Sequence, residues 1–216
     1  MNRNYRKHQF THMKFFIHCV SLLFLLAFSA EAQSQAALNS ALAKDLETFK
    51  RVTLRNDFDS TLQFMPPKMF DIIPRDSLRD LMTKSVDNEY MRIEMTGFQY
   101  TGKQKIKKAG IYQWAFVTYD GSMKLYLKGE DSFNQLMIPM MKSTFGEKNV
   151  VQSGDKTLDV SMPDKQIIAY KDPASPIWSF LEDKRGQEDA MQQYIYENVV
   201  PKEVQKAVGK KKVKKK

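Results

Sequence analysis

The sequence predicts an α+β protein in which helices come first and a run of strands follows, with one helix inserted among the strands. Two changes in hydrophobic spacing support this order. Apolar residues recur at helical spacing as far as residue 86, and from residue 90 they alternate with polar residues at a period of two. The strands then follow one another rather than alternating with helices, which favours an antiparallel sheet over a parallel one.

The first helix is expected over residues 36–56. Its apolar residues share one face and its charged residues occupy the other. The apolar face holds Leu38, Leu42, Leu46, Phe49 and Val52. Asp57-Phe58-Asp59 then breaks the helical pattern.

Two shorter helical segments follow. Residues 60–74 contain Pro66-Pro67, which a helix interior does not tolerate, so we expect a turn and a short helix there. Pro74 opens a third helix, which ends near Asn88. One face of that helix carries Leu78, Leu81, Met82 and Val86.

A first strand is expected from Tyr90, where Met91, Ile93 and Met95 alternate with polar residues. The basic, glycine-bounded residues 102–110 are expected to form a connection or an exposed strand edge. Between residues 111 and 129 the odd positions are apolar on both sides of Asp120-Gly121. Two structures keep these apolar odd positions on one face of the sheet. One is a single long strand with a bulge at Gly121, and the other is a hairpin whose three-residue loop is 120–122.

The remaining elements alternate between helix and strand. Residues 131–145 are expected to form the inserted helix, with Pro139 as a kink or a start and Gly146 as its end. Strands are expected at 158–162, 166–170 and 177–181, the last two joined by a hairpin loop at 172–176. A final helix is expected over about 187–197.

The first 32 residues have the composition of a secretory signal peptide. A basic segment precedes an apolar stretch of 16 residues, and Ala30-Glu31-Ala32 fits the cleavage pattern of small residues. The apolar stretch is short for a membrane span, which needs about 20 residues. We therefore expect cleavage after Ala32 and export to the periplasm of a Gram-negative envelope or to the outside of the cell. The alternative is an uncleaved anchor.

Removing that segment changes what chemistry the chain can perform. The only Cys, Cys19, and all three His lie within residues 1–32. The remaining chain therefore has no disulfide, no thiolate nucleophile, no Ser-His-Asp triad and no His or Cys metal site, and we expect no metal and no cofactor. We expect residues 33–200 to form a single α+β domain, followed by a basic, disordered tail at 201–216.

Several scattered segments resemble the nuclear transport factor 2-like superfamily (SnoaL-like, within the cystatin-like cone-shaped folds). They span about residues 36–182 and comprise the first helix running into Asn56-Asp57-Phe58, the segment from Pro66 to Phe70, the helix opened by Pro74, the strand with residues 114–119, the turn at 145–150, and residues 169–172 followed by Trp178. The resemblance implies a curved antiparallel sheet wrapped around helices, an apolar pocket and dimerisation through the sheet. It implies no single function, since that fold carries isomerases, cyclases, dehydratases and binding domains.

Methionines on predicted core faces are candidates for the pocket of a binding domain, because Met is flexible and polarizable. Ordinary core packing would explain the same positions. The candidate residues around a small apolar ligand are Met82, Met95, Tyr119, Met123, Met137 and Met141.

A second group of aromatic residues lies on the opposite face of the long strand. These residues are Tyr112, Trp114, Phe116 and Tyr126. An aromatic stripe on the second face of a sheet must be covered. Either a homodimer interface through the sheet or another segment of the same chain would cover it.

An enzyme of the isomerase or hydrolase type is the alternative function. Such an enzyme would pair a carboxylate in an apolar pocket with a tyrosine donor. The candidate carboxylates are Glu94 and Asp120, with Tyr100, Tyr119 and Tyr126 as donors. Glu94 alternates with Ile and Met and is expected to face solvent, and Asp120 beside Gly121 suits a turn or a bulge.

The last seven residues contain six lysines, which we expect to contact an anionic envelope surface. They are Lys210, Lys211, Lys212, Lys214, Lys215 and Lys216. Near anionic lipid each lysine contributes about 1 kcal/mol. Nucleic acid is a disfavoured partner, because residues 33–209 carry 24 basic and 24 acidic residues. The sequence therefore favours an exported, non-catalytic ligand-binding or protein-interaction domain without a membrane span after cleavage.

Overall fold

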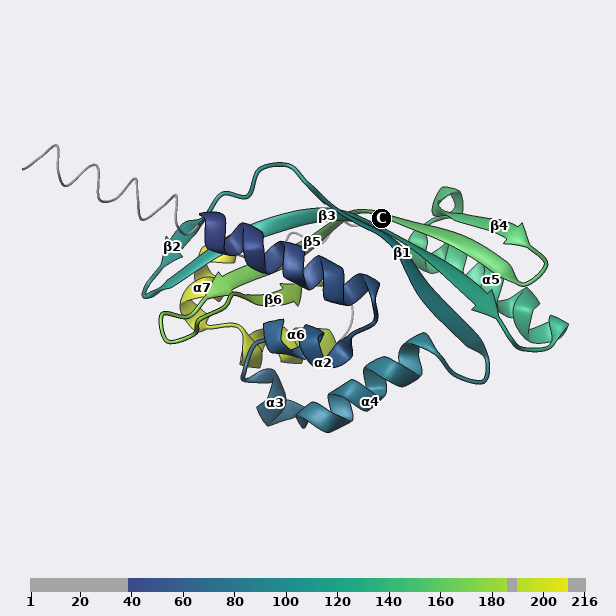
Figure 1. Cartoon of the computed structure of the whole chain (residues 1–216), viewed down its shortest axis with the longest axis horizontal. Helices are drawn as coiled ribbons and strands as arrows, with labels where there is room; N and C mark the ends of the chain where they lie inside the picture. The colour runs from purple at the N-terminus through teal and green to yellow at the C-terminus, as the bar shows by residue number, and fades with distance from the viewer. Residues whose placement is uncertain (1–38, 186–189, 210–216) are drawn as a thin grey trace, which may run out of the picture. The chain divides into compact units, whose positions relative to one another are not determined.

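The computed structural model describes residues 39–185 and 190–209 (Figure 1). The chain divides into two compact units, residues 1–44 and 45–216. The predicted signal segment, Cys19 and the three His lie outside the described residues, as do Leu38 and the six C-terminal lysines. The architecture below is that of the second unit.

The first described helix ends at residue 54, close to the expected boundary. Its predicted apolar face is buried at Leu46 and Val52. Asn56 follows with a φ of 53°, and the Asp57 carboxylate accepts a hydrogen bond from the Ser60 N–H at 3.1 Å. Asp57 therefore ends one helix and caps the next, as its position in the sequence predicts.

Short helices follow before the sheet begins. They are α2 (Phe58–Thr61), the 3-10 turn η1 (Leu62–Phe64), α3 (Met69–Ile72) and α4 (Arg75–Val86). Pro74 stands at the N-cap of α4, as expected. The apolar face of α4 is only partly buried: Leu78 is half-buried against a core cluster, whereas Leu81 is 56% exposed.

The sheet contains six antiparallel strands and remains open. The strands are β1 (Met91–Thr101), β2 (Lys107–Ala109), β3 (Tyr112–Leu127), β4 (Val150–Gly154), β5 (Thr157–Lys171) and β6 (Ser179–Glu182). Their order is β1-β3-β5-β4, while β2 also pairs with β3 and β6 with β5. Figure 1 shows β3 and β5 running the length of the curved sheet. The predicted α+β class, with helices preceding a curved antiparallel sheet, is confirmed.

Residues 112–127 form one long strand rather than the hairpin with a loop at 120–122. The strand is central, with β1 on one side and β5 on the other. Its register with β5 shifts between Tyr119 and Gly121, where Asp120 lies opposite Pro163 and Asp164. This bulge also explains why the predicted strands 158–162 and 166–170 are a single strand, β5: a bulge accommodates a proline inside a sheet.

Helices cover the two ends of the sheet on opposite faces. The inserted helix α5 (Asp131–Phe145) contains Pro139 and ends at Gly146, whose φ is 96°. It covers the odd positions of the second half of β3, including Met123 and Leu125. Helices α6 (Ala190–Val199) and α7 (Lys202–Val208) cover the even positions of its first half. No helix among the described residues is long and apolar enough to cross a membrane.

Two further elements, β4 and α7, depart from the sequence-based expectation. Strand β4 lies in a segment assigned to no strand, and only Val150 within it is buried. The turn η2 (Glu147–Asn149) precedes it. Residues 202–208, assigned to the tail, form α7, where Val204 is fully buried. A short, polar edge strand and a helix with one buried side chain both lack the hydrophobic periodicity on which the expectation relied.

Candidate functional site

A groove of about 610 Å³ lies where four segments of the chain meet. Its walls come from the turn before α3, the first residue of β3, the β5–β6 loop and the α6–α7 junction. The lining residues are Pro67, Lys68, Tyr112, Tyr170, Asp172, Ala174, Ser175, Ser179, Val199, Pro201, Lys202 and Glu203. In Figure 1 this is the end of the sheet where β2, α7 and the loop between β5 and β6 come together.

Two tyrosines contribute the aromatic surface of the groove. Tyr112 begins β3, and Tyr170 lies near the end of β5 opposite Trp114. Their rings meet edge to face, with centroids 6.4 Å apart and planes at 81°. The Tyr170 hydroxyl donates to the Val199 carbonyl at 3.4 Å and therefore ties the sheet to the end of α6.

The β5–β6 loop is held by its own polar side chains. The Asp172 carboxylate accepts from the Ala174 N–H at 2.9 Å. The Ser175 hydroxyl donates to the Ile177 carbonyl at 2.8 Å and accepts from its N–H. The Trp178 N–H donates to Asp45 at 2.9 Å, which fixes the loop to the first helix. The groove therefore has a preformed wall on this side.

Helix α7 forms the opposite wall and packs closely on the β2–β3 turn. Gly110 in that turn has a φ of 61°, and a Cβ there would lie 3.0 Å from the Glu203 side chain. A larger residue at position 110 is disfavoured both by this contact and by the left-handed backbone. The Lys202 ammonium donates to the Glu197 carbonyl at 2.9 Å, so it is engaged at the end of α6.

An ion pair fixes the end of α7 behind this wall. The Arg185 guanidinium binds both Asp183 carboxylate oxygens, at 2.8 and 3.0 Å, and also donates to the Gly209 carbonyl. It lies over the rings of Phe116 and Tyr196, at 5.6 and 5.5 Å from their centroids. Planar geometry suits arginine to such stacked, bidentate contacts.

Burial and nearby carboxylates shape the acid–base behaviour of the groove. Burial raises the pKa of Tyr170 well above its usual value of 10. Burial, and then the negative charges of Asp172 and Glu203, raise the pKa of Tyr112. Both hydroxyls therefore stay protonated at neutral pH and act as hydrogen-bond donors rather than as bases.

Four of the six predicted pocket residues gather in one cluster. Met123 and Met137 are buried there, with Met95 and Met141 packed against them between α5 and the sheet. Met82 lies on α4, and Tyr119 stacks on Phe98 with ring centroids 4.4 Å apart. None of the six lines the groove. The arrangement of the four clustered methionines is that of a core beneath α5.

Three of the four predicted interface residues are covered by the chain itself. Trp114 is 2% exposed, and Tyr112 and Phe116 pack in the same cluster against Val200 and Val204. Of the two alternatives for this aromatic stripe, cover by another segment of the same chain applies to these three. Tyr126 lies beyond the cover, with the Arg92 guanidinium 4.5 Å above its ring.

Neither predicted carboxylate lies in an apolar pocket. Glu94 is exposed, accepts a hydrogen bond from the Tyr126 hydroxyl at 3.1 Å and borders a smaller hollow of about 180 Å³. Asp120 is exposed and accepts from the Asp164 N–H at 2.9 Å, which supports the left-handed φ of 54° at Asp164. Water screens both groups, so neither environment favours acid–base catalysis.

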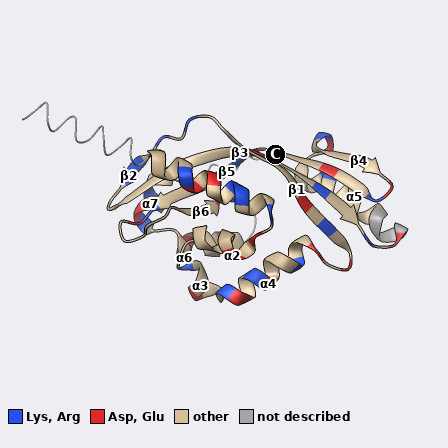
Figure 2. Ribbon diagram, viewed as in Figure 1, with Lys and Arg blue, Asp and Glu red and all other residues tan. Residues whose placement is uncertain are grey.

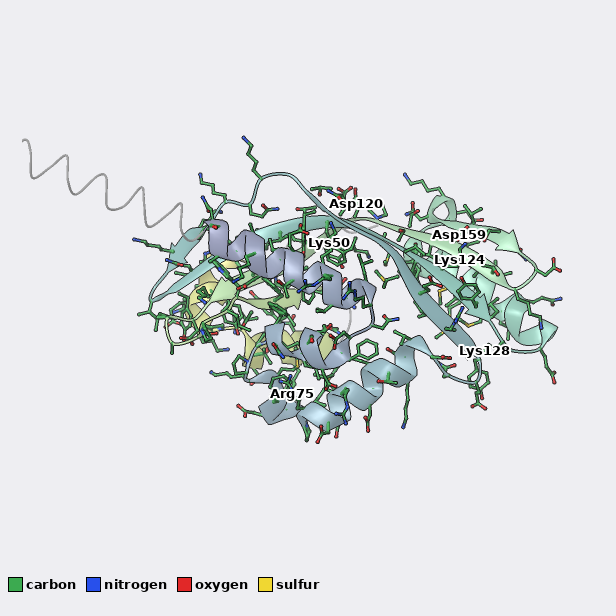
Figure 3. The ribbon with its side chains drawn as sticks, viewed as in Figure 1. Lys50, Arg75, Asp120, Lys124, Lys128 and Asp159 are labelled. Carbon is green, nitrogen blue, oxygen red and sulfur yellow. The ribbon has the colours of Figure 1, made fainter. Side chains whose placement is uncertain are left out.

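The exposed part of the sheet beside Tyr126 is a polar surface. Lys124 and Asp159 lie next to each other there, 3.6 Å apart across β3 and β5 (Figure 3). Figure 2 shows basic and acidic residues interspersed over the ribbon. Within the described residues no group of three or more His, Cys, Asp or Glu could hold a metal ion.

Sequence reasoning missed the groove residues other than Tyr112. One local signal was available: Asp172-Pro173-Ala174-Ser175-Pro176 was assigned to a hairpin loop, and it forms one wall. Nothing local connects that loop with Pro67 or with Glu203. The anionic-surface role of the lysine tail stays a prediction, because the tail lies outside the described residues.

The comparisons with known proteins identify no family for this chain. No family model, no curated protein and no solved structure matches this chain. The resemblance to the nuclear transport factor 2-like superfamily therefore stays a prediction, and so does dimerisation through the sheet. The α+β architecture itself stands on the observed order of helices and strands.

Proposed function

We propose that this protein is an exported, non-catalytic ligand-binding domain. Its ligand has an apolar body and occupies the groove between the β5–β6 loop and α7. The observation that carries the proposal is the groove itself. Its volume of about 610 Å³ falls within the range of small-molecule sites, and Tyr112 and Tyr170 offer aromatic surface beside a few polar groups.

The polar groups of the groove favour binding over catalysis. Ser175 uses its hydroxyl within its own loop, and Lys202 is bonded to a backbone carbonyl. Tyr112 and Tyr170 have raised pKa values, so they supply donors and no base. A nucleophile needs an adjacent base to activate it, and no groove residue is paired in that way.

Titration with small neutral aromatic probes tests the proposal. The full-length protein would be titrated with 2-phenylethanol, indole and p-cresol while backbone amide resonances are recorded by NMR. We expect shifts at the amides of the β5–β6 loop and of the α6–α7 junction. Tyr112→Ala should weaken binding about tenfold, because an aromatic contact at the centre of a site contributes more than 1 kcal/mol.

Tyr126→Ala is the matched control, since Tyr126 lies on the same strand but outside the groove. It should leave the affinity within about twofold, because changes away from the contact surface act weakly. Probe shifts confined to the polar face of the sheet would contradict the proposal. So would equal losses in the two variants.

Export is tested by the mass of the protein isolated from the cells that make it. We expect a mature chain beginning at Gln33, because the small residues Ala30 and Ala32 fit a signal-peptidase site. A mass that includes residues 1–32 would contradict cleavage and favour an anchored form.

A further inference from the structure

The groove carries negative charge on two walls that face the same tyrosine. Asp172 belongs to the β5–β6 loop and Glu203 to α7, and both line the groove with Tyr112. The two carboxylates lie close enough to Tyr112 to raise its pKa, after the larger effect of burial. Within the groove, Tyr112 is therefore accompanied by acids from segments about thirty residues apart in the chain.

These carboxylates have no cationic partner in the described part of the chain. Asp172 accepts one backbone N–H through one oxygen, which leaves its other oxygen available. Neither Asp172 nor Glu203 forms an ion pair with a residue in 39–185 or 190–209. Of the two lysines that line the groove, Lys202 donates to the Glu197 carbonyl, and Lys68 stands on the separate wall before α3.

A buried hydroxyl completes this side of the groove. Ser179 is 7% exposed and lies at the start of β6, opposite Tyr170 in the sheet. Its hydroxyl is hydrogen-bonded to Tyr170, and because a hydroxyl oxygen has two lone pairs, it still offers an uncharged acceptor to the groove that it lines. Two carboxylates, a hydroxyl and a tyrosine ring together match the needs of an ammonium group, which donates three hydrogen bonds and is attracted to aromatic faces.

We propose that the groove selects organic cations: a ligand whose ammonium group lies between Asp172 and Glu203 against Tyr112, and whose apolar body extends along the groove beside Tyr170. This inference rests on the proposed ligand-binding function and adds the charge of the ligand. The physical reason is complementarity, since an anion in the same position would face two carboxylates.

Three probes with one aromatic body and different charges test the inference. These are 2-phenylethylamine, 2-phenylethanol and 3-phenylpropanoate, titrated into the full-length protein at low salt and neutral pH and followed by groove amide resonances. We expect the amine to bind about fivefold more tightly than the alcohol, because a partly exposed ion pair and a cation–π contact each contribute modestly. The carboxylate should bind more weakly than the alcohol.

Isosteric variants connect this preference with the two acids. Asp172→Asn keeps the acceptor for the Ala174 N–H, and Glu203→Gln keeps the side-chain shape. Each should reduce the preference for the amine over the alcohol about two- to threefold, and the double variant should abolish it. Lys68→Met removes a positive charge from the same groove and should increase the preference or leave it unchanged. Added salt should weaken the preference in the native protein.

Failure of the inference and failure of the proposed function give different results. If the amine and the alcohol shift the groove amides with equal affinity, the groove binds ligands without charge selection, and only the inference is overturned. If the amine preference survives in the double variant, the cation site lies elsewhere and the inference is again overturned. If none of the three probes shifts the groove amides, the proposed function fails as well.

Discussion

At the scale of single residues, Asp183 and Arg185 form a buried ion pair. The Asp183 side chain is fully buried and that of Arg185 is 8% exposed. Their bidentate pairing, the stacking of Arg185 between two rings and its bond to Gly209 connect the sheet, α6 and the end of α7. Burying two charges is costly, so the pair is stabilising only while both partners and their hydrogen bonds are present.

Removal of one partner should therefore be far more damaging than removal of an exposed pair. We expect Asp183→Ala to lower the free energy of unfolding by about 3–5 kcal/mol, because it leaves a buried guanidinium without its counter-charge. The matched control is Asp159→Ala, which breaks the exposed pair with Lys124 and should cost about 1 kcal/mol or less. Urea denaturation measures both. Equal costs would show that the buried pair is dispensable.

At the scale of elements, α7 is a short helix that depends on tertiary packing. It contains seven residues, and Val204 is its one buried side chain. That side chain packs with Trp114 and Val200 against the sheet, while Glu203 and Lys202 face the groove. A helix of this length is not stable by itself, so its packing on β2 and β3 holds the groove wall in place.

Truncation of Val204 should therefore affect both stability and binding. We expect Val204→Ala to lower the free energy of unfolding by about 2 kcal/mol, through lost burial and the cavity left behind. The same variant should weaken the binding of 2-phenylethanol, because the wall bearing Glu203 loosens. Lys206→Ala, on the exposed side of α7, is the control for urea denaturation and NMR titration. Unchanged binding in Val204→Ala would separate α7 from the site.

The bulge between β3 and β5 acts at the same scale. Pro163 lacks an N–H for the ladder, and Asp164 adopts a left-handed φ of 54°. Asp120 lies opposite both and satisfies the Asp164 N–H at 2.9 Å. The extra residue lies on β5, so the inward-facing positions of β5 change from even to odd across the bulge, while β3 keeps its odd positions inward along its whole length.

At the scale of the whole molecule, one buried tyrosine and two half-buried ones make the stability depend on pH in the alkaline range. Burial raises the pKa of Tyr100, Tyr119 and Tyr170 well above the ordinary value of 10. Below about pH 10 these groups are neutral in both the folded and the unfolded protein. Above it they ionise in the unfolded chain first. Unfolding then releases protons, so the free energy of unfolding falls as pH rises.

The slope of the free energy of unfolding against pH can be assigned to single tyrosines. Each tyrosine contributes up to about 1.4 kcal/mol per pH unit above its unfolded pKa. We expect Tyr119→Phe to retain the stacking on Phe98 and to reduce the slope by about one tyrosine's share. Urea denaturation at a series of pH values from 8 to 11, with tyrosinate absorbance as a second readout, measures it. An unchanged slope in Tyr119→Phe would show that Tyr119 ionises freely in the folded protein.

Local patterns in the sequence determined the class of the fold and most of its elements. Helical spacing located the buried Leu46 and Val52 of the first helix, Asp57 marked its end, and Gly146 marked the end of α5. These features depend on residues within four positions of one another, which is the range of helix periodicity and capping. Strand β4 could have been predicted as well, because Gly154-Asp155 before Leu158 is a hairpin signal.

Tertiary structure alone decided what covers the sheet and where the groove lies. The apolar odd positions of residues 111–129 are compatible both with a hairpin and with one long strand. The pairing with β1 and β5 shows that the segment is one long strand. The aromatic stripe could have met a second copy or another segment of the chain, and α6 and α7 pack against its Tyr112, Trp114 and Phe116. The groove joins Pro67 to Glu203, which are far apart in the chain. Periodicity reports which face of an element is apolar, and only the packed chain determines which distant segment meets that face.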